Sequence, residues 1–243
     1  ELKKNGVTDE QMGTWVPFPE ANLPYWNRHN ATPQDFSMIV NRYLGSMKKQ
    51  FPKAKGSVLL NSATYESDDF DWQRGDYTSL LPYVSKLDSK LVDSFGLQGF
   101  SWSPPANRSG TGIYDAREYL NSDMAIEAAQ KIGVKDIWFN TGTFVSKYTQ
   151  DTERKVVLSP SKRKDIAQGI TNELKRAQGE GYTVRINIFA EDKSQVAEAT
   201  DWKEVGSISI NTASQITNLV ITLNKLNQDG AVLNQVIAWN GTN

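Results

Sequence analysis

A carboxylate and an amide follow the first apolar run of the chain at a spacing that suits acid–base chemistry. The run from Trp15 to Phe18 is followed by Glu20 and then by Asn22. Such a run predicts a buried strand whose last residues emerge into a loop. In a β/α barrel, polar residues at the carboxyl end of a strand face the substrate. Glu20 is therefore our candidate general acid, and we expect Asn22 to orient it or to bind a substrate hydroxyl.

Aromatic and basic residues lie close to Glu20 in the sequence. They are Trp15, Tyr25, Trp26, Arg28 and His29. Aromatic side chains combine a broad apolar face with a polar edge, which suits stacking on a pyranose ring, so we expect Trp26 and His29 to bind substrate. The alternative is that Glu20 caps a loop or pairs with Arg28, because a single glutamate after a strand is a weak motif.

The composition is that of a globular chain with one sizeable core. The 243 residues are 38% hydrophobic and 23% charged, with a net charge of −1. This near-zero charge argues against a nucleic-acid partner, and no apolar run reaches the ~20 residues of a membrane span. Cysteine is absent, which excludes a disulfide framework and a thiolate metal site. The lack of cysteine is compatible with export, and we expect an extracellular or cell-surface location.

Apolar runs alternate with amphipathic segments along the chain. We expect strands at residues 15–18, 57–61, 97–102, 134–140 and 182–189. Helices are expected at residues 33–47, 80–92, 116–132 and 160–178, and the last segment, from about residue 216, also has helical spacing. Thr32, Pro33 and Asp35 form a helix start, with Thr32 at the N-cap, and Ser159 and Pro160 form another. The 3.6-residue spacing in the first helix predicts one buried face made of Phe36, Ile39, Val40, Tyr43, Leu44 and Met47. Gly133 is expected to end the third of these helices.

The alternation predicts parallel βαβ units, and we expect residues 1–243 to form a single domain. A (β/α)8 TIM-type barrel is the predicted fold, but eight units of about 40 residues need about 320, more than the chain has. We therefore expect this chain to supply strands 4–8, held by an N-terminal fragment of the same precursor. The alternative is that residues 204–243 supply the missing strands. A doubly wound sheet is the competing fold, although no phosphate-binding glycine pattern follows any strand.

The run Val16-Pro17-Phe18-Pro19-Glu20-Ala21-Asn22, followed by Tyr25-Trp26 and by Pro33-Gln34-Asp35-Phe36, resembles the fourth barrel strand of clan A glycoside hydrolases. It is most similar to the mannanase-type family 26. The resemblance implies that Glu20 is the acid/base of a polysaccharide hydrolase. It also places Gly99-Phe100-Ser101-Trp102 at strand six of the barrel.

The same resemblance implies a nucleophilic glutamate at the end of strand seven, and this chain departs from it there. The corresponding residues, Trp138 to Gly142, include Asn140 but no carboxylate. Glycoside hydrolysis needs two carboxyl groups, about 5 Å apart for retention of configuration. Glu191 is the first candidate for the second one, because it follows the next expected strand. Asp192, Glu66 and Asp68 are the others.

The remaining expected substrate contacts also lie at or after strand ends: Asn140, Trp102, Trp202 and Asp192. The acidic stretch from Glu66 to Asp76 is either a solvated loop or a binding loop. The single histidine cannot build a metal cluster, and no cofactor motif is present, so we expect no metal and no cofactor. Because Asn140 replaces a carboxylate, the alternative function is a non-catalytic carbohydrate-binding protein on a barrel scaffold.

Overall fold

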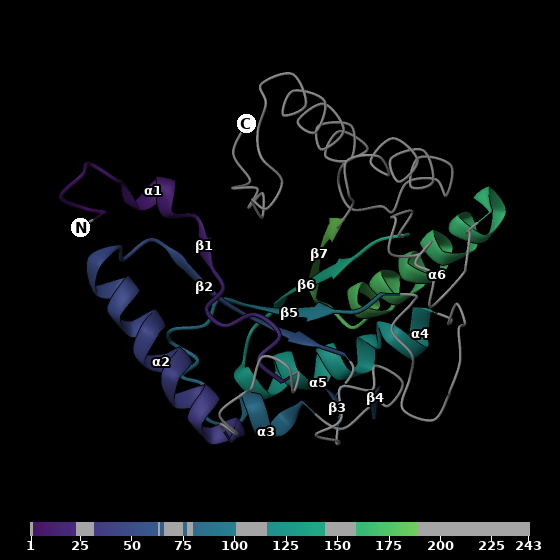
Figure 1. Ribbon diagram of the computed structural model, residues 1–243, viewed down its shortest axis with the longest axis horizontal. Coiled ribbons are helices and arrows are strands. Elements are labelled where there is room, and N and C mark those ends of the chain that lie inside the picture. Colours follow the sequence, from purple (N-terminus) through teal and green to yellow (C-terminus); the bar gives the residue numbers. More distant parts are fainter. Residues whose placement is uncertain are drawn as a thin grey trace, which may run out of the picture.

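The computed structural model describes residues 2–22, 32–62, 64–65, 75–76, 80–100, 116–143 and 159–188. These residues form an α/β structure around a five-stranded parallel sheet (Figure 1). Its strands are β1 (Thr14–Trp15), β2 (Lys55–Asn61), β5 (Ser94–Gln98), β6 (Asp136–Thr141) and β7 (Thr183–Ile188). Two short antiparallel strands, β3 (Thr64–Tyr65) and β4 (Gly75–Asp76), pair separately.

The strands lie side by side in the order β1-β2-β5-β6-β7, which is also their order along the chain. A doubly wound sheet reverses direction at a switch point, and the described sheet contains no such reversal. Because crossovers between parallel strands are right-handed, an order without reversal places the connecting helices on one face. Figure 1 shows the helices following one another around that side of the sheet. The prediction of an α/β parallel sheet is confirmed and agrees with part of a TIM-type barrel. Barrel closure stays a prediction.

Local sequence signals set the ends of the long helices. The helix α2 (Pro33–Gln50) begins with a capping box in which Thr32 and Asp35 bond each other's backbone N–H. Ser159 caps α6 (Pro160–Gly179), and Gly133 ends α5 (Ser122–Ile132) in the left-handed conformation with φ 89°. The other described helices are α1 (Asp9–Met12), α3 (Leu81–Val84) and α4 (Ala116–Tyr119). The predicted starts at Thr32 and Ser159 and the predicted stop at Gly133 are confirmed.

The core lies between the helices and one face of the sheet. Alternate strand residues point into it, and the helices cover them with their own apolar stripes. The fully buried strand members are Val58, Leu60, Phe95, Leu97, Ile137 and Phe139. The helices contribute Val40, Leu44, Ala125, Ala129, Ile170 and Leu174. The helices thereby cover one face of the sheet.

Several predicted elements differ from those in the structure. The segment 80–92 is helical only over α3. The residues after α3 form turns, and Leu87 and Leu91 pack against the core. The predicted strand 97–102 begins earlier, at Ser94, and ends at Gln98. The predicted helix 116–132 is divided into α4 and α5, since Asn121 caps a new helix start. The first strand is only Thr14–Trp15, and the residues before Glu20 form a turn.

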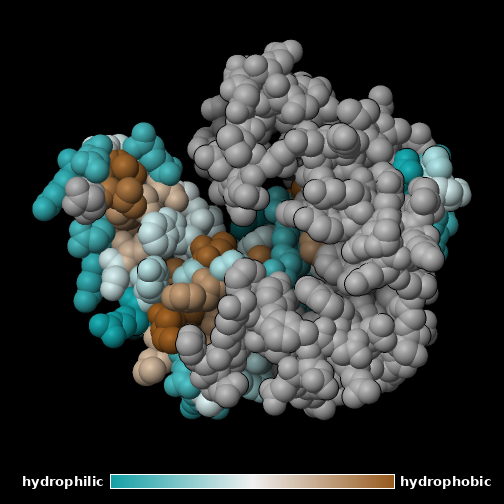
Figure 2. All heavy atoms as spheres, viewed as in Figure 1, coloured by the Kyte–Doolittle hydropathy of each residue, from teal (hydrophilic) through white to brown (hydrophobic). Residues whose placement is uncertain are grey.

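The outer side of α2 is more apolar than the predicted single buried stripe requires. Ile39 and Tyr43, which were expected to be buried, are 39% and 50% exposed, and Met38 is 62% exposed. The ring of Phe18 packs edge-on against Tyr43 at 5.3 Å between centroids. Brown surface lies over this part of the molecule in Figure 2. None of the described helices is long and apolar enough to cross a membrane.

Candidate functional site

The face of the sheet opposite the helices is lined with polar side chains. Along each strand, these residues alternate with the core residues, as the pleat of a strand requires. They are Ser57, Asn61, Ser94, Gln98, Trp138, Asn140, Arg185 and Asn187. Figure 2 shows hydrophilic surface in the middle of the view, where Figure 1 places the strands. A polar face at the carboxyl ends of parallel strands is where α/β proteins bind ligands.

Four side-chain amides form a row across this face, which we call the amide row. It consists of Asn61 on β2, Gln98 on β5, Asn140 on β6 and Asn187 on β7. The strand register pairs each with the next: Asn61 with Gln98, Gln98 with Asn140, and Asn140 with Asn187. The first three are buried, with 6%, 9% and 8% exposure. Buried amides require hydrogen-bond partners, and neighbouring amides and Glu20 supply them.

The hydrogen bonds of the amide row lead to Glu20. Nδ2 of Asn187 donates to Oδ1 of Asn140 at 2.6 Å, and Nδ2 of Asn140 donates to Oε1 of Gln98. Gln98 in turn donates through Nε2 to Oε1 of Glu20. From the other side, Nδ2 of Asn61 donates to the same carboxylate oxygen at 2.8 Å. Two amide donors therefore converge on one oxygen of the candidate acid.

The turn after β1 holds Glu20 over the strand ends. The N–H of Glu20 donates to the carbonyl of Leu59 at 2.9 Å. Phe18 and Glu20 both have positive φ angles, 53° and 57°. Such angles are uncommon outside glycine, and they concentrate at functional sites. The turn brings a half-buried carboxylate to the carboxyl end of β2.

Asn22 fixes the end of this turn to the same strand. Its Nδ2 donates to the carbonyl of Asn61 at 2.8 Å, and its Oδ1 accepts from the Asn61 N–H at 2.9 Å. The side chain is 5% exposed. Asn22 thus bonds the backbone of the residue whose side chain bonds Glu20. Its roles in orienting Glu20 and in contacting substrate stay predictions.

A second polar layer lies beneath the amide row. Nε1 of Trp138 donates to Oγ of Ser57 at 2.8 Å, and Oγ of Ser94 donates to the same oxygen at 2.9 Å. The indole covers Gly96, where a Cβ atom would lie only 2.4 Å from Cε2 of the ring. Trp138 therefore supports the floor of the site.

An ion pair lies at the opposite, amino end of the same face. Arg185 binds Asp136 through Nε at 3.1 Å and Nη2 at 2.8 Å. Burial raises the pKa of Asp136 above its ordinary value of 3.8, and the Arg185 charge opposes this rise. Each charge has its partner within the pair, and the two residues stabilise the end of the sheet away from Glu20.

Three predicted site residues lie in the described structure: Glu20, Asn22 and Asn140. The structure links Glu20 to Asn140 through Gln98 and to Asn22 through Asn61. The other predicted site residues lie outside the described residues: Trp26, His29, Trp102, Glu191, Asp192 and Trp202. The acidic residues Glu66 and Asp68 lie outside them as well. These assignments stay predictions.

Three members of the amide row were not identified from the sequence: Asn61, Gln98 and Asn187. A signal was present, because Asn61 and Gln98 are the last residues of their strands, as Asn140 nearly is. A polar residue ending each strand was the sign that these ends share one site. Within the described residues, no group of three or more histidine, cysteine, aspartate or glutamate side chains is placed to hold a metal ion.

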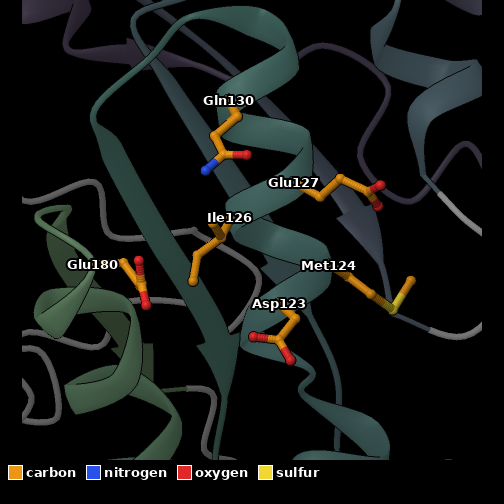
Figure 3. Close-up of a pocket in the computed structure, with 6 residues that line it drawn as sticks. All are labelled: Asp123, Met124, Ile126, Glu127, Gln130 and Glu180. Carbon is orange, nitrogen blue, oxygen red and sulfur yellow. The ribbon is translucent and has the colours of Figure 1, made fainter.

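A hollow of about 420 Å³ lies elsewhere, between α5 and the end of α6 (Figure 3). Its lining residues are Asp123, Met124, Ile126, Glu127, Gln130 and Glu180. Arg176 and Arg117 donate to Asp123, and the Arg176 bond is the main cause of the lowered pKa of that carboxyl. These acids lie on α5 and just after α6, in the helix layer, and not on the polar face of the sheet. We therefore place the candidate site at Glu20 and the amide row.

No protein-family model matches the chain, and no curated protein matches its sequence. Among solved structures, the chain is similar to the endo-β-1,4-mannanase from Thermotoga petrophila, with 12% sequence identity and a TM-score of 0.38. The match covers 92% of this chain and 45% of the mannanase chain, so the chain spans less than half of the length of that protein. The candidate site rests on the geometry around Glu20 and not on these comparisons.

Proposed function

We propose that the chain acts on a polysaccharide as a glycoside hydrolase, with Glu20 as general acid/base on a TIM-type barrel. The observation that carries this proposal is the convergence of Asn61 and Gln98 on one carboxylate oxygen of Glu20. A half-buried carboxyl held by two neutral donors at the carboxyl ends of parallel strands is fixed in place for proton transfer. The carboxylate of Glu20 and the amides beside it offer the acceptors and donors that sugar hydroxyls require.

We assign different tasks to the two oxygens of Glu20. Oε1 accepts hydrogen bonds from both amides. In a protonated carboxyl group, the oxygen that carries the proton is a poorer acceptor than the carbonyl oxygen. The transferable proton therefore belongs on Oε2. In the proposed reaction, Glu20 gives this proton to the glycosidic oxygen while the bond from that oxygen to the anomeric carbon breaks. The second carboxylate attacks that carbon or activates water, and Glu191 is our candidate for it.

A second candidate function is non-catalytic carbohydrate binding. It is favoured by Asn140, which takes the strand-end position where the resembled family has its nucleophile and which is fixed in the amide row by Gln98 and Asn187. An amide cannot serve as the carboxylate nucleophile of a retaining reaction. In this case Glu20 would accept hydrogen bonds from sugar hydroxyls, and the site would hold a glycan without cleaving it.

The two functions are separated by assaying glycan binding and reducing-end release on one panel of plant and bacterial polysaccharides. Hydrolysis predicts release that is lost in Glu20→Gln and retained in Glu127→Gln. The second variant is a matched control, because Glu127 lines the hollow between α5 and α6. Binding without release over long incubation would favour the binding protein. Release lost in Glu127→Gln but retained in Glu20→Gln would move the site to the helix layer.

A further inference from the structure

The hydrogen bonds that join Asn187, Asn140 and Gln98 to Glu20 all run in the same direction. A carboxylate only accepts hydrogen bonds, so Gln98 must present its NH2 group to Glu20 and its carbonyl oxygen to the other side. That carbonyl then requires the NH2 group of Asn140, whose own carbonyl requires the NH2 group of Asn187. One ionised group thus fixes the orientation of three amides in succession.

We propose that Asn187 is a positioning residue for Glu20 and acts on it through Asn140 and Gln98. Among the described hydrogen bonds, the side chain of Asn187 bonds Asn140 and neither carboxylate oxygen of Glu20. Gln98 and Asn187 are separated by two strand spacings, about 10 Å. Burial of Gln98 and Asn140 keeps water from replacing the intermediate bonds, and hydrogen bonds in such a chain polarise one another.

The direction of these hydrogen bonds matters because reversing it would change the protonation of Glu20. If the three amides turned round, Gln98 would direct its carbonyl oxygen at the carboxylate. Two acceptors facing each other repel, and the contact becomes favourable only when Glu20 carries a proton between them. The orientation set at Asn187 therefore favours the ionised form of Glu20 over the protonated form. This inference rests on the proposed role of Glu20 in proton transfer, but its test does not require turnover.

Within the described residues, the strand side chains that bond the Glu20 carboxylate do not titrate. The contacts from β2 and β5 are the amides of Asn61 and Gln98, and β6 and β7 contribute Asn140 and Asn187. None of these four side chains titrates. The charged residues on this face of β6 and β7 are Asp136 and Arg185, which pair with each other.

The first test uses the unaltered protein and NMR. Chemical shifts are followed as the pH is lowered. They are measured for the carboxyl carbon of Glu20 and for the side-chain NH2 groups of Gln98, Asn140 and Asn187. If Glu20 orients Gln98, Asn140 and Asn187, then the chemical shifts of all three NH2 groups change with the same midpoint as the carboxyl carbon of Glu20. A response at Gln98 with none at Asn187 would overturn the proposal. A midpoint at Asn187 that differs from that of Glu20 would also overturn it.

The second test places a competing carboxylate at the far end. Asn187→Asp should reorient the amide row and move the Glu20 midpoint to higher pH by about 1 or more. In a Gln98→Met background, the same change should move the midpoint at most a third as far, because only screened charge–charge repulsion remains. Equal shifts in the two backgrounds would contradict the proposal. Asn187→Ser, which keeps a donor, should leave the midpoint in place.

These outcomes are separable from the proposed hydrolysis. If no glycan is turned over but the titrations follow the expected pattern, then the hydrolase proposal fails and the positioning role stands. If glycan is turned over, the alkaline limb of the pH–rate profile, where Glu20 loses the proton it must donate, should move with the Glu20 midpoint in Asn187→Asp. If Glu20→Gln is inactive but the pH–rate profile does not move in Asn187→Asp, then the positioning role of Asn187 is overturned and the role of Glu20 stands.

Discussion

Asn61 on β2 donates a hydrogen bond of 2.8 Å from its side-chain amide to Oε1 of Glu20 on the turn after β1. The backbone of the same residue is bonded on both its N–H and its carbonyl by Asn22. One strand-end residue thus holds the candidate acid with its side chain and the turn that carries the acid with its main chain. This relationship ties the local fold of the turn to the chemistry of the site.

Replacing Asn61 with aspartate should place two carboxyl groups in hydrogen-bond contact. Like charges so close cannot both ionise, so one pKa of the pair rises in the folded protein. A raised folded pKa gives stability that is present at low pH and lost as the pH rises through that pKa. We expect Asn61→Asp to lower the free energy of unfolding by about 1–3 kcal/mol at pH 7 and by less at pH 4.5.

Urea unfolding at the two pH values checks this prediction. Asn172→Asp is the matched control, because Asn172 is exposed on α6 and its carboxamide oxygen accepts from Gln168 at 3.0 Å. A loss of stability in Asn61→Asp that is equal at both pH values would show that Glu20 and Asn61 are not coupled.

Gly96→Ala should disturb the floor of the site. A Cβ atom at this position would lie 2.4 Å from Cε2 and 2.6 Å from Cζ2 of Trp138, and the indole is held by its bond to Ser57. Relieving such overlap means moving a large ring, so we expect a loss of about 1–3 kcal/mol in the free energy of unfolding. Trp138 fluorescence should change as the ring moves.

Gly179→Ala is the control for this substitution. Gly179 lies at the end of α6, and a Cβ atom there would meet nothing within 4 Å. We expect that variant to unfold within about 0.5 kcal/mol of the unaltered protein. Equal stability of the two alanine variants would contradict the packing of Trp138 over Gly96.

The capping box of α2 should make stability depend on pH at acid values. Two hydrogen bonds from Thr32 lower the pKa of Asp35 below its ordinary value of 3.8. The bond from the hydroxyl has the larger effect and the bond from the backbone N–H the smaller. A depressed folded pKa gives stability that is present above 3.8 and lost as the pH falls through the folded pKa. Asp35→Ala should therefore be less stable than the unaltered protein at pH 6, and the gap should narrow below pH 3.

Thermal unfolding across this pH range, followed by circular dichroism, measures the gap. A constant difference between the two proteins from pH 6 to below pH 3 would mean that the Asp35 charge contributes nothing to the helix start.

The sequence predicted the elements whose signals are local. Thr32 and Ser159 begin helices because each satisfies a free N–H of the first turn, and Gly133 ends one because it adopts a positive φ. The start of β5 was predicted too late because Ser94 and Gly96 interrupt its apolar residues. The structure explains both residues: Ser94 bonds Ser57, and Gly96 makes room for Trp138.

The candidate site could be predicted only in part for a similar reason. Glu20, Asn22 and Asn140 follow or end apolar runs, and each was identified from that position. Asn61, Gln98 and Asn187 join them through the lateral register of four strands. Register between strands is decided by packing across the whole sheet, which no single segment encodes. The exposure of Ile39 and Tyr43 on α2 likewise depends on tertiary packing and not on helical spacing.

The central proposal is that Glu20 supplies the proton to the leaving group. It is tested most directly by comparing Glu20→Gln with the unaltered protein on a natural glycan and on an activated aryl glycoside of the same sugar. The glutamine keeps an oxygen for Asn61 and Gln98 but cannot transfer the proton. A leaving group of low pKa needs no protonation, whereas a sugar alkoxide does.

We predict that Glu20→Gln lowers kcat about 10²- to 10⁴-fold on the natural glycan and by less than about tenfold in bond cleavage of the aryl glycoside. Cleavage of that aryl bond is measured as the pre-steady-state burst of phenolate. Equal losses on the two substrates, or no loss on the natural glycan, would contradict the assignment of Glu20 as the general acid.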